Sequence, residues 1–416
     1  MVPVPVTTRE LPKREPRLRR FLRGAFLLVA TALLATAGLS CASRSPSLTT
    51  QNSPRLPRNV VAESLRLARS YLFRSQKAAG NFRYEYDFTA GETLHSDNQV
   101  RQAGALWAVA LLHADRPTPD SRRAVSRGLD FFRRHSRLTS DGRRYVAYPD
   151  SGTGGTGTVA LVALSIVEVL ETEPASEWTA GLREDLWEYV SFLLSLRTED
   201  GRFQGRYSLR SGRGMGEPSP YADGETLLLL TKVARLLDRE DLRKTALEGA
   251  ETMYRRYVRE ALERQADIPT AKQFYQWGCL AFYEIYTAGW PGWEKWARIT
   301  VRMGEWMIDV HRTLWRRKNT SYAHEGLAVA WELAHRTGRT EAREKIGHIH
   351  DLGLRKLISW QVGGPLPNPY LQSLEDVPEE AVGGVMNSRS DPVLRIDVTQ
   401  HFAHALLLTR RFVYRK

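Results

Sequence analysis

The 416-residue sequence is poor in cysteine and lacks the short motifs that mark several common enzyme classes. It has two cysteines, Cys41 and Cys279, and Cys279 lies in a predicted helix. If Cys41 is lipidated, no disulfide can form and the core alone must stabilise the fold. The glycine-rich stretch 152–157 lacks the Gly-Lys-Ser/Thr ending of a P-loop. No Gly-x-Ser-x-Gly elbow, zincin motif or Cys-x-x-Cys pair occurs, which argues against the classes that depend on them.

The sequence also has no dense basic stripe, although its net charge is +13. Residues 1–24 hold seven basic and two acidic side chains, and so carry five of these thirteen charges. Neither a zinc-finger spacing nor an RNA-binding signature accompanies the excess, so we expect no nucleic-acid partner. The remaining positive charge either favours anionic partners or is dispersed surface arginine, which is the commoner case.

The amino-terminal segment predicts export. After the basic stretch, the 17 residues from Gly24 to Ser40 are uncharged and rich in Ala and Leu. This is a signal-peptide pattern, and it is short for a transmembrane helix. The run ends in Gly38-Leu-Ser-Cys41, which resembles a bacterial lipobox except that Gly38 replaces the usual Leu or Val.

We therefore expect a signal peptide with a lipobox over 1–41, lipidation of Cys41 and a flexible tether over 42–59, a segment rich in Ser, Pro and Arg. The expected location is the bacterial cell envelope, at the periplasmic side of a membrane. Cleavage after Ala42 and an uncleaved anchor are the alternatives.

Helical periodicity starts at about residue 60 and continues to about 412. Six amphipathic helices, expected on the outside, alternate with six that are apolar on most sides and are expected inside. The expected outer helices span 61–76, 120–137, 180–197, 241–262, 293–313 and 341–360. The expected inner helices span 98–114, 156–172, 222–238, 273–288, 320–337 and 396–411.

The inner helices recur often enough to predict an array or a closed ring. Their starts are separated by 47 to 76 residues, which is a degenerate hairpin repeat. An open solenoid would need polar capping repeats, whereas the last predicted helix is among the most apolar. We therefore predict an all-α fold, an (α/α)6 toroid of six helical hairpins over residues 60–412.

Loop lengths give this ring two different faces. Connections from an inner to an outer helix are short, whereas those from an outer to an inner helix include long ones at 77–97, 138–155, 198–221 and 361–395. Because the inner helices run parallel, the long, β-hairpin-like connections must share one face. Loops longer than connection requires usually carry function.

Six hairpins with long loops before the inner helices resemble the (α/α)6 toroid superfamily of carbohydrate-active enzymes. That superfamily includes glycoside hydrolases, polysaccharide lyases, acylglucosamine 2-epimerases and the carboxy-terminal domain of D-glucuronyl C5-epimerases. The segments Tyr221–Glu225 and Arg395–His401 look most like the epimerase-type bacterial envelope members. The resemblance covers about residues 60–412 and implies a polysaccharide or oligosaccharide partner, while a shared fold does not fix the chemistry.

In such a ring the amino-terminal ends of the inner helices meet at the mouth, where unpaired N–H groups favour anions. The first inner helix opens with Asn98 and carries Arg101 one turn inside. Arg101 is either a clamp for a substrate carboxylate or part of a structural ion pair. Tyr221 and Glu225 open the third inner helix, where capping explains an acid but general acid–base catalysis would use one too.

The next two inner helices also begin with polar and aromatic side chains. Tyr275, Gln276 and Trp277 suit a sugar face, with aromatic packing in the core as the alternative. His324, near the start of the fifth inner helix, is either a proton shuttle or a satisfied core histidine.

The last helix holds the densest cluster. Asp397 and His401 are spaced i, i+4 and share a face, so Asp397 can orient His401 as a base or form a structural pair that closes the ring. A metal site that includes His404 is disfavoured because no further Cys/His cluster at ligand spacing accompanies it. We expect no metal and no cofactor.

These residues predict an envelope enzyme that abstracts a proton next to the carboxylate of an acidic polysaccharide, as an epimerase or a lyase. The expected catalytic residues are Tyr221, Glu225, His324, Asp397 and His401. The expected substrate-binding residues are Asn98, Arg101, Tyr275, Gln276, Trp277, Arg395 and Gln400.

Two alternative functions remain open. A glycoside hydrolase of the same fold would need two carboxylates flanking the bond, with Glu225 and either Glu325 or Asp397 as the pair. A non-catalytic lipoprotein that binds glycan or protein during envelope assembly would need no catalytic pair.

Overall fold

A computed structural model describes residues 55–148 and 152–415 of the chain. The predicted signal peptide, the lipidation of Cys41 and most of the predicted tether lie outside these residues. The first helix begins at Arg58, two residues before the predicted domain boundary. None of the described helices combines the length and the apolar character that spanning a bilayer requires.

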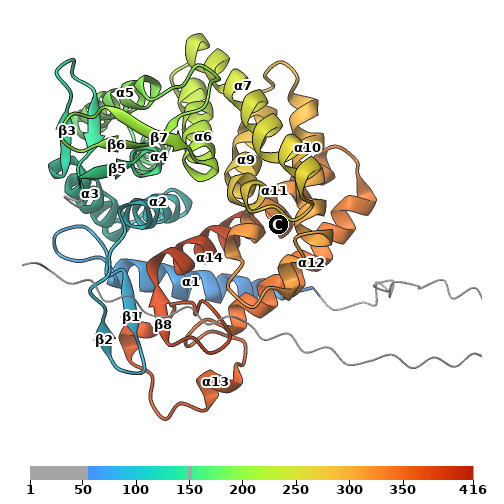
Figure 1. Cartoon of the computed structure of the whole chain (residues 1–416). Coiled ribbons are helices and arrows are strands. Elements are labelled where there is room, and N and C mark those ends of the chain that lie inside the picture. The colour runs from blue at the N-terminus through green and yellow to red at the C-terminus, as the bar shows by residue number, and fades with distance from the viewer. Residues whose placement is uncertain (1–54, 149–151, 416) are drawn as a thin grey trace, which may run out of the picture. The chain divides into compact units, whose positions relative to one another are not determined.

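The described chain consists of twelve principal helices that alternate between an inner and an outer layer, as the sequence predicts (Figure 1). The outer helices are α1 (Arg58–Arg74), α3 (Pro119–Arg134), α5 (Glu177–Ser195), α7 (Glu240–Tyr254), α10 (Trp293–Asp309) and α12 (Thr340–Ser359). The inner helices are α2 (Gln99–Asp115), α4 (Thr156–Thr172), α6 (Pro220–Leu236), α9 (Pro269–Thr287), α11 (Ser321–Arg336) and α14 (Ile396–Leu408).

Burial patterns explain the two layers. Every residue of α4 from Thr156 to Leu170 is buried, as expected of a helix surrounded by other helices. In α3, by contrast, the buried residues recur every three or four positions along one face. Thr118 and Ser176 start α3 and α5 with capping boxes, which satisfy backbone N–H groups that a helix start leaves unpaired.

The inner helices form a closed ring. Each packs against the next in the order α2, α4, α6, α9, α11, α14, and α14 packs against α2 to complete the circle. At this closing contact a Cβ atom on Gly104 of α2 would lie 2.6 Å from the side chain of Gln400 on α14, so any larger residue would displace that side chain. The predicted (α/α)6 toroid is therefore confirmed.

All the strands lie in outer-to-inner connections, which confirms the predicted asymmetry of the two faces. They pair antiparallel in three small sheets, ordered β2-β1-β8, β3-β4 and β5-β6-β7. The pairing of β1 with β8 joins the first long loop to the last. The strands are β1 (Glu85–Asp87), β2 (Glu92–Thr93), β3 (Ser136–Leu138), β4 (Arg144–Val146), β5 (Thr153–Gly155), β6 (Gln204–Ser208), β7 (Gly214–Pro218) and β8 (Val393–Arg395).

Two predicted helices differ in detail. The fourth outer helix widens into a π-helical turn at Arg255–Arg259 and continues as α8 (Glu260–Arg264). The last inner helix likewise ends in a π-helical turn at Thr409–Val413. A short helix, α13 (Pro369–Gln372), lies within the longest connection.

Ion pairs join the carboxy-terminal halves of the inner helices, at the end opposite the long loops. Lys232 of α6 lies 3.1 Å from both Glu168 and Glu171 of α4, and Arg235 lies 2.5 Å from Glu284 of α9. Burial works against the charge of Lys232, but the three surrounding carboxylates outweigh it and raise the pKa of the amine. These pairs link neighbouring inner helices at the end of the ring opposite the cavity.

We expect Gly326→Ala to destabilise the ring. A Cβ atom at position 326 of α11 would lie 2.4 Å from the ring of Tyr275, which is fully buried on α9, so the ring or one of the two helices must shift. Overpacking of this kind costs about 1–3 kcal/mol, which exceeds the helix propensity gained with Ala. The free energy of unfolding in urea measures the effect. Gly181→Ala on α5 is the matched control, because open space surrounds it and we expect stabilisation by up to about 1 kcal/mol.

Candidate active site

A cavity of about 500 Å³ opens at the end of the ring that carries the long loops. All six inner helices contribute to its wall, because their amino-terminal halves converge there. Ten of the twelve predicted site residues line it. They are Asn98, Arg101, Tyr221, Glu225, Gln276, Trp277, Arg395, Asp397, Gln400 and His401.

At the inner end of this cavity, one buried carboxylate holds two histidines. Glu325 of α11 is inaccessible to solvent, and its Oε1 accepts a hydrogen bond from Nδ1 of His401 at 2.7 Å. Its Oε2 accepts from Nδ1 of His404 at 2.9 Å and from Nε2 of Gln276 at 3.3 Å. Three donors from α9 and α14 therefore satisfy a carboxylate that would otherwise be costly to bury.

This arrangement fixes the charge and the orientation of His401. Burial raises the pKa of Glu325, but its attraction to His404 and His401 outweighs burial and lowers the pKa, so Glu325 is ionised. An ionised carboxylate only accepts, so Nδ1 of His401 carries a proton and Nε2 is left for the cavity. Burial lowers the pKa of His401, yet the charge of Glu325 and the hydrogen bond to it prevail and raise it. His401 therefore holds its second proton to a higher pH than a free imidazole does.

Aromatic rings pack around the two histidines. The ring centroids of Trp107 and His404 lie 4.8 Å apart in an edge-on arrangement, and those of Trp107 and Trp277 lie 5.5 Å apart. Trp277 in turn lies 6.4 Å from the ring of His401. These contacts exclude water from one side of the histidine pair and give the cavity an aromatic surface that suits a sugar face.

Asp397 does not orient His401, which corrects the predicted dyad. Both oxygens of Asp397 accept from the guanidinium of Arg395, at 3.1 and 2.6 Å, and Nε of Arg101 lies 3.3 Å from Oδ2. The i, i+4 spacing does bring Asp397 and His401 to one face, but Arg395 is closer along the chain and Glu325 reaches His401 from the neighbouring helix. Arg395 is thus occupied, whereas Arg101 remains 39% exposed at the cavity.

Glu225 faces the cavity as a buried carboxyl group. Its side chain lies against Gly157 of α4, where a Cβ atom would approach Oε2 to 1.9 Å. Burial raises the pKa of Glu225 to about 8, so the group is protonated at neutral pH and can donate a hydrogen bond. Gln400 Oε1 is buried in the same wall and has no hydrogen-bond partner within residues 55–148 and 152–415.

His324 does not reach the cavity, so its predicted role as a proton shuttle does not fit its position. Its ring points outward toward α12, against Gly353, and its Nδ1 lies 3.3 Å from Nδ1 of His350. Burial lowers the pKa of His324 well below its ordinary value, which keeps the ring neutral. His324 is therefore a core histidine, although the sequence alternative of a satisfied one is met only at Nδ1, because Nε2 has no hydrogen-bond partner among the described residues.

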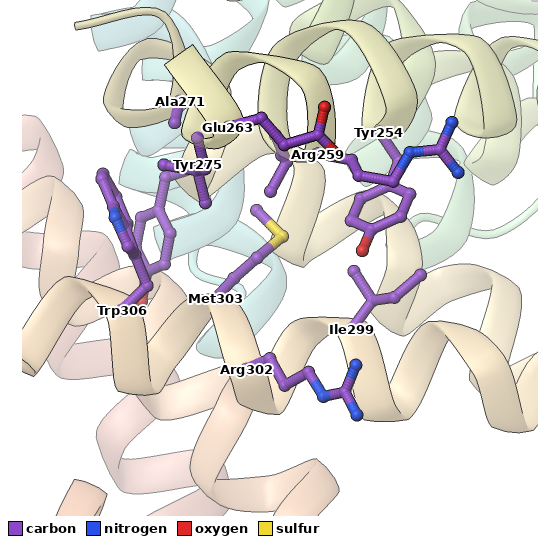
Figure 2. Close-up of a pocket in the computed structure, with 11 residues that line it drawn as sticks. Tyr254, Arg259, Glu263, Ala271, Tyr275, Ile299, Arg302, Met303 and Trp306 are labelled. Carbon is purple, nitrogen blue, oxygen red and sulfur yellow. The ribbon is translucent and has the colours of Figure 1, made fainter. Parts of the chain in front are cut away.

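Tyr275 also lies outside the cavity, contrary to its predicted place at the sugar face. It is fully buried, and its ring lines a separate pocket of about 390 Å³ between α9, α10 and the π-helical turn after α7. In Figure 2 the side chain of Tyr275 lies beside Trp306, on the same side of Met303. Its neighbours in sequence, Gln276 and Trp277, face the cavity instead.

Asn98 and Tyr221 lie at the starts of two inner helices, at the rim of the cavity. The side chain of Asn98 caps α2 by accepting from the backbone N–H of Arg101 at 3.2 Å. Tyr221 stands in the first turn of α6 and is 43% exposed.

Within the described residues, no group of three or more His, Cys, Asp or Glu side chains is arranged to hold a metal ion.

The predicted residue set omits four polar side chains that line the cavity, namely Ser219, Asn319, Tyr322 and Asn387. Tyr322 stands in the first turn of α11, so the helix-start argument could have selected it. Asn319 and Asn387 belong to loops and are joined by a backbone hydrogen bond of 2.8 Å, for which the sequence holds no signal.

No family model matches the chain, and no curated protein matches it in sequence. Solved structures do match over nearly their whole length. The cellobiose 2-epimerase of Bacillus thermoamylovorans gives a TM-score of 0.61 at 9% identity, over 84% of this chain and 98% of that one. The cellobiose 2-epimerase of Spirochaeta thermophila gives 0.60 at 13% identity, over 86% and 96%.

A third similar structure is the GH76 α-1,6-mannanase of Salegentibacter, with a TM-score of 0.58 at 6% identity, over 85% of this chain and 99% of that one. These proteins share the (α/α)6 toroid with this chain. At such low identities the likeness establishes the fold alone, because epimerases and a mannanase have the same architecture.

We expect Glu225→Gln to stabilise the protein increasingly as the pH rises. The pKa of Glu225 is about 8 in the folded state and about 4.5 when unfolded, so the folded state binds the extra proton. Its contribution is intact below pH 4.5 and is lost as the pH rises through 8. Glutamine removes this penalty, which is on the order of 5 kcal/mol at most. Melting temperatures of both proteins from pH 5 to 9 measure the difference.

The exposed Glu217 of β7 provides the control for this experiment. Glu217→Gln should change the melting temperature by the same small amount at every pH. A constant difference between Glu225→Gln and the wild type across the pH range would contradict the buried, protonated state of Glu225.

Proposed function

We propose that this protein is a carbohydrate-active enzyme of the bacterial envelope that moves a proton at a sugar carbon next to a carboxylate or carbonyl group. The observation that carries the proposal is the pairing, in one cavity, of the Glu325-supported His401 with the protonated Glu225. A carbon acid of this kind is labilised by hydrogen bonds to the oxygen on which charge develops. Glu225 supplies such a hydrogen bond, and His401 supplies a proton through Nε2.

The substrate class follows from the groups at the mouth. Arg395, Arg101 and Asp397 together leave one net positive charge, and Arg101 has the exposed guanidinium. The starts of six inner helices add partial positive charge at the same end. We infer that an acidic polysaccharide or oligosaccharide binds, with a uronate carboxylate on Arg101 and a sugar face on Trp277. An epimerase similar to the D-glucuronyl C5-epimerases or a lyase fits this arrangement.

Hydrolysis by the same fold has weaker support. A hydrolase needs an acid and an ionised carboxylate on either side of the bond. Glu325 is enclosed by His401, His404 and Gln276, and both oxygens of Asp397 are bound to Arg395. Glu225 alone thus remains as an unengaged carboxyl group among the predicted pairs.

The activity can be tested in D₂O on a panel of oligosaccharides. The acidic members are oligomers of glucuronate, mannuronate and galacturonate, and the neutral members are cellobiose, mannose and α-1,6-mannan. Deuterium incorporation reports epimerisation, ultraviolet absorbance reports elimination, and new reducing ends report hydrolysis. We expect deuterium incorporation or elimination with a uronate oligomer. His401→Gln, which removes the proton donor, and Glu225→Ala, which removes the hydrogen-bond donor, should each lower product formation by about 10²–10⁴-fold.

His335→Gln is the control, since this histidine is exposed at the far end of α11 and should leave activity unchanged. The value of kcat/KM should fall on the alkaline side with a limb near pH 8, where Glu225 loses its proton. Reducing ends without deuterium incorporation would instead establish a hydrolase. Glycan binding with no turnover by the wild type would establish a binding module.

Anchoring to the membrane is a separate proposal that rests on the sequence of residues 1–41. If Cys41 carries the lipid, Cys41→Ser should move the protein from the membrane fraction to the soluble fraction of the envelope. Fractionation followed by immunoblotting measures this, with Cys279→Ser as the matched control because Cys279 is buried. A wild-type protein already in the soluble fraction would mean cleavage at Ala42 instead.

A further inference from the structure

A second hydrogen-bonded histidine connects the cavity to the surface of the ring. Tyr322, in the first turn of α11, lines the cavity, and its hydroxyl lies 3.3 Å from Nε2 of His311. Nδ1 of the same histidine lies 2.7 Å from Oδ1 of Asp267. His311 is buried, whereas the side chain of Asp267 is 38% exposed. Tyrosine, histidine and aspartate therefore form a continuous chain from the cavity toward solvent.

The directions of these hydrogen bonds can be assigned. Burial raises the pKa of Asp267, but hydrogen bonds from His311 and Arg316 outweigh it and lower the pKa, so Asp267 is ionised. Nη2 of Arg316 lies 3.1 Å from Nδ1 of His311, but the ionised Asp267 is closer, at 2.7 Å, and accepts only, which favours the proton of His311 on Nδ1. Burial lowers the pKa of His311, and the nearby charges of Arg316 and Lys272 lower it further, so the ring is neutral. Its Nε2 is then an acceptor, and Tyr322 donates to it.

The hydrogen bonding of Tyr322 differs in direction from that of His401. The hydroxyl proton of Tyr322 points to His311, so a lone pair of the tyrosine oxygen is left for the cavity. A tyrosine held in this way accepts a proton from a substrate as it passes its own to the histidine. His401, in contrast, is held by Glu325, which raises the pKa of the imidazole and favours a proton on the nitrogen that faces the cavity. Tyr322 can therefore accept a proton in the cavity, whereas His401 can donate one.

We propose that Tyr322 is the base of the reaction, and that His311 and Asp267 are positioning residues that take up its proton. The inference rests on the proposed function, which names a donor but leaves the acceptor unassigned. The C–H bond next to the carboxylate breaks, its proton moves to Oη of Tyr322, and the hydroxyl proton of Tyr322 moves to Nε2 of His311. The electron pair of the bond passes into the carboxylate, whose charge Arg101 and Glu225 stabilise.

The second half of the reaction restores the charge balance. His401 gives its Nε2 proton to the same carbon in an epimerase, or to the departing glycosidic oxygen in a lyase. The pair of electrons returns to the new C–H bond, or forms the double bond that expels the oxygen. Once the product leaves, Tyr322 releases the abstracted proton to water in the cavity and recovers its own proton from Nε2 of His311. His401 takes up a proton from water at Nε2, which completes the cycle. Since burial raises the pKa of Tyr322, a free phenolate does not form in advance, and transfer to His311 must accompany abstraction.

Tyr322→Phe tests the inference because it removes one oxygen and leaves the ring. With the uronate oligomer that the wild type converts, in D₂O, we expect Tyr322→Phe to lose both deuterium exchange and product formation by about 100-fold or more. His401→Gln should lose product formation to a similar extent but keep exchange into recovered substrate within about tenfold, because abstraction by Tyr322 is reversible. His311→Gln should lower kcat at an unchanged KM.

Tyr286→Phe is the matched control, since Tyr286 lies in the last turn of α9 and should not affect either measurement. Exchange by Tyr322→Phe within about threefold of the wild type would overturn the inference. So would loss of exchange in His401→Gln alone, which would make His401 the base. If the wild type neither exchanges nor converts any sugar of the panel, the proposed function fails first, and the assignment of Tyr322 falls with it.

Discussion

The site depends on the burial of one carboxylate, Glu325, inside the ring. An ionised group without water is tolerated only where donors replace its hydration, and here α9 and α14 supply them through Gln276, His401 and His404. The same bonds tie α11 to its two neighbours at one height. Because Nδ1 of His401 is committed to Glu325, its other nitrogen must face the cavity. The hydrogen bonds of Glu325 thus both join three inner helices and orient His401, the proposed proton donor.

The toroid separates this site from the part that holds the helices together. Parallel inner helices bring their amino-terminal ends to one face, where N–H groups lack partners and anions are favoured. Their carboxy-terminal halves carry the ion pairs around Lys232 and Glu168 instead. The loops that start the inner helices join by strand pairing, as β1 does with β8. Polar side chains can therefore vary at the mouth without disturbing the pairs at the other end.

The sequence predicts this fold because the spacing of apolar residues identifies the helices and the loop lengths identify the two faces of the ring. An amphipathic stripe identifies an outer helix, and a helix apolar on all sides identifies an inner one, as in α3 and α4. The sequence predicts the residues that line the cavity less completely. An inner helix is apolar on most sides, so its sequence does not show which side faces the axis of the ring. Tyr275 and Gln276 are adjacent in sequence yet face different cavities. Nor does spacing within α14 reveal that Glu325, on another helix, holds His401.

Two carboxylate–histidine pairs in this molecule have opposite effects, and their surroundings explain why. Glu325 is fully enclosed and ionised, so its attraction prevails over burial and His401 gains proton affinity. Asp267 is partly in solvent and shares its charge with Arg316, so burial prevails and His311 loses proton affinity. A carboxylate beside a histidine therefore does not by itself define a base. Exposure to solvent and the nearest cation decide whether burial of the histidine or its attraction to the carboxylate prevails.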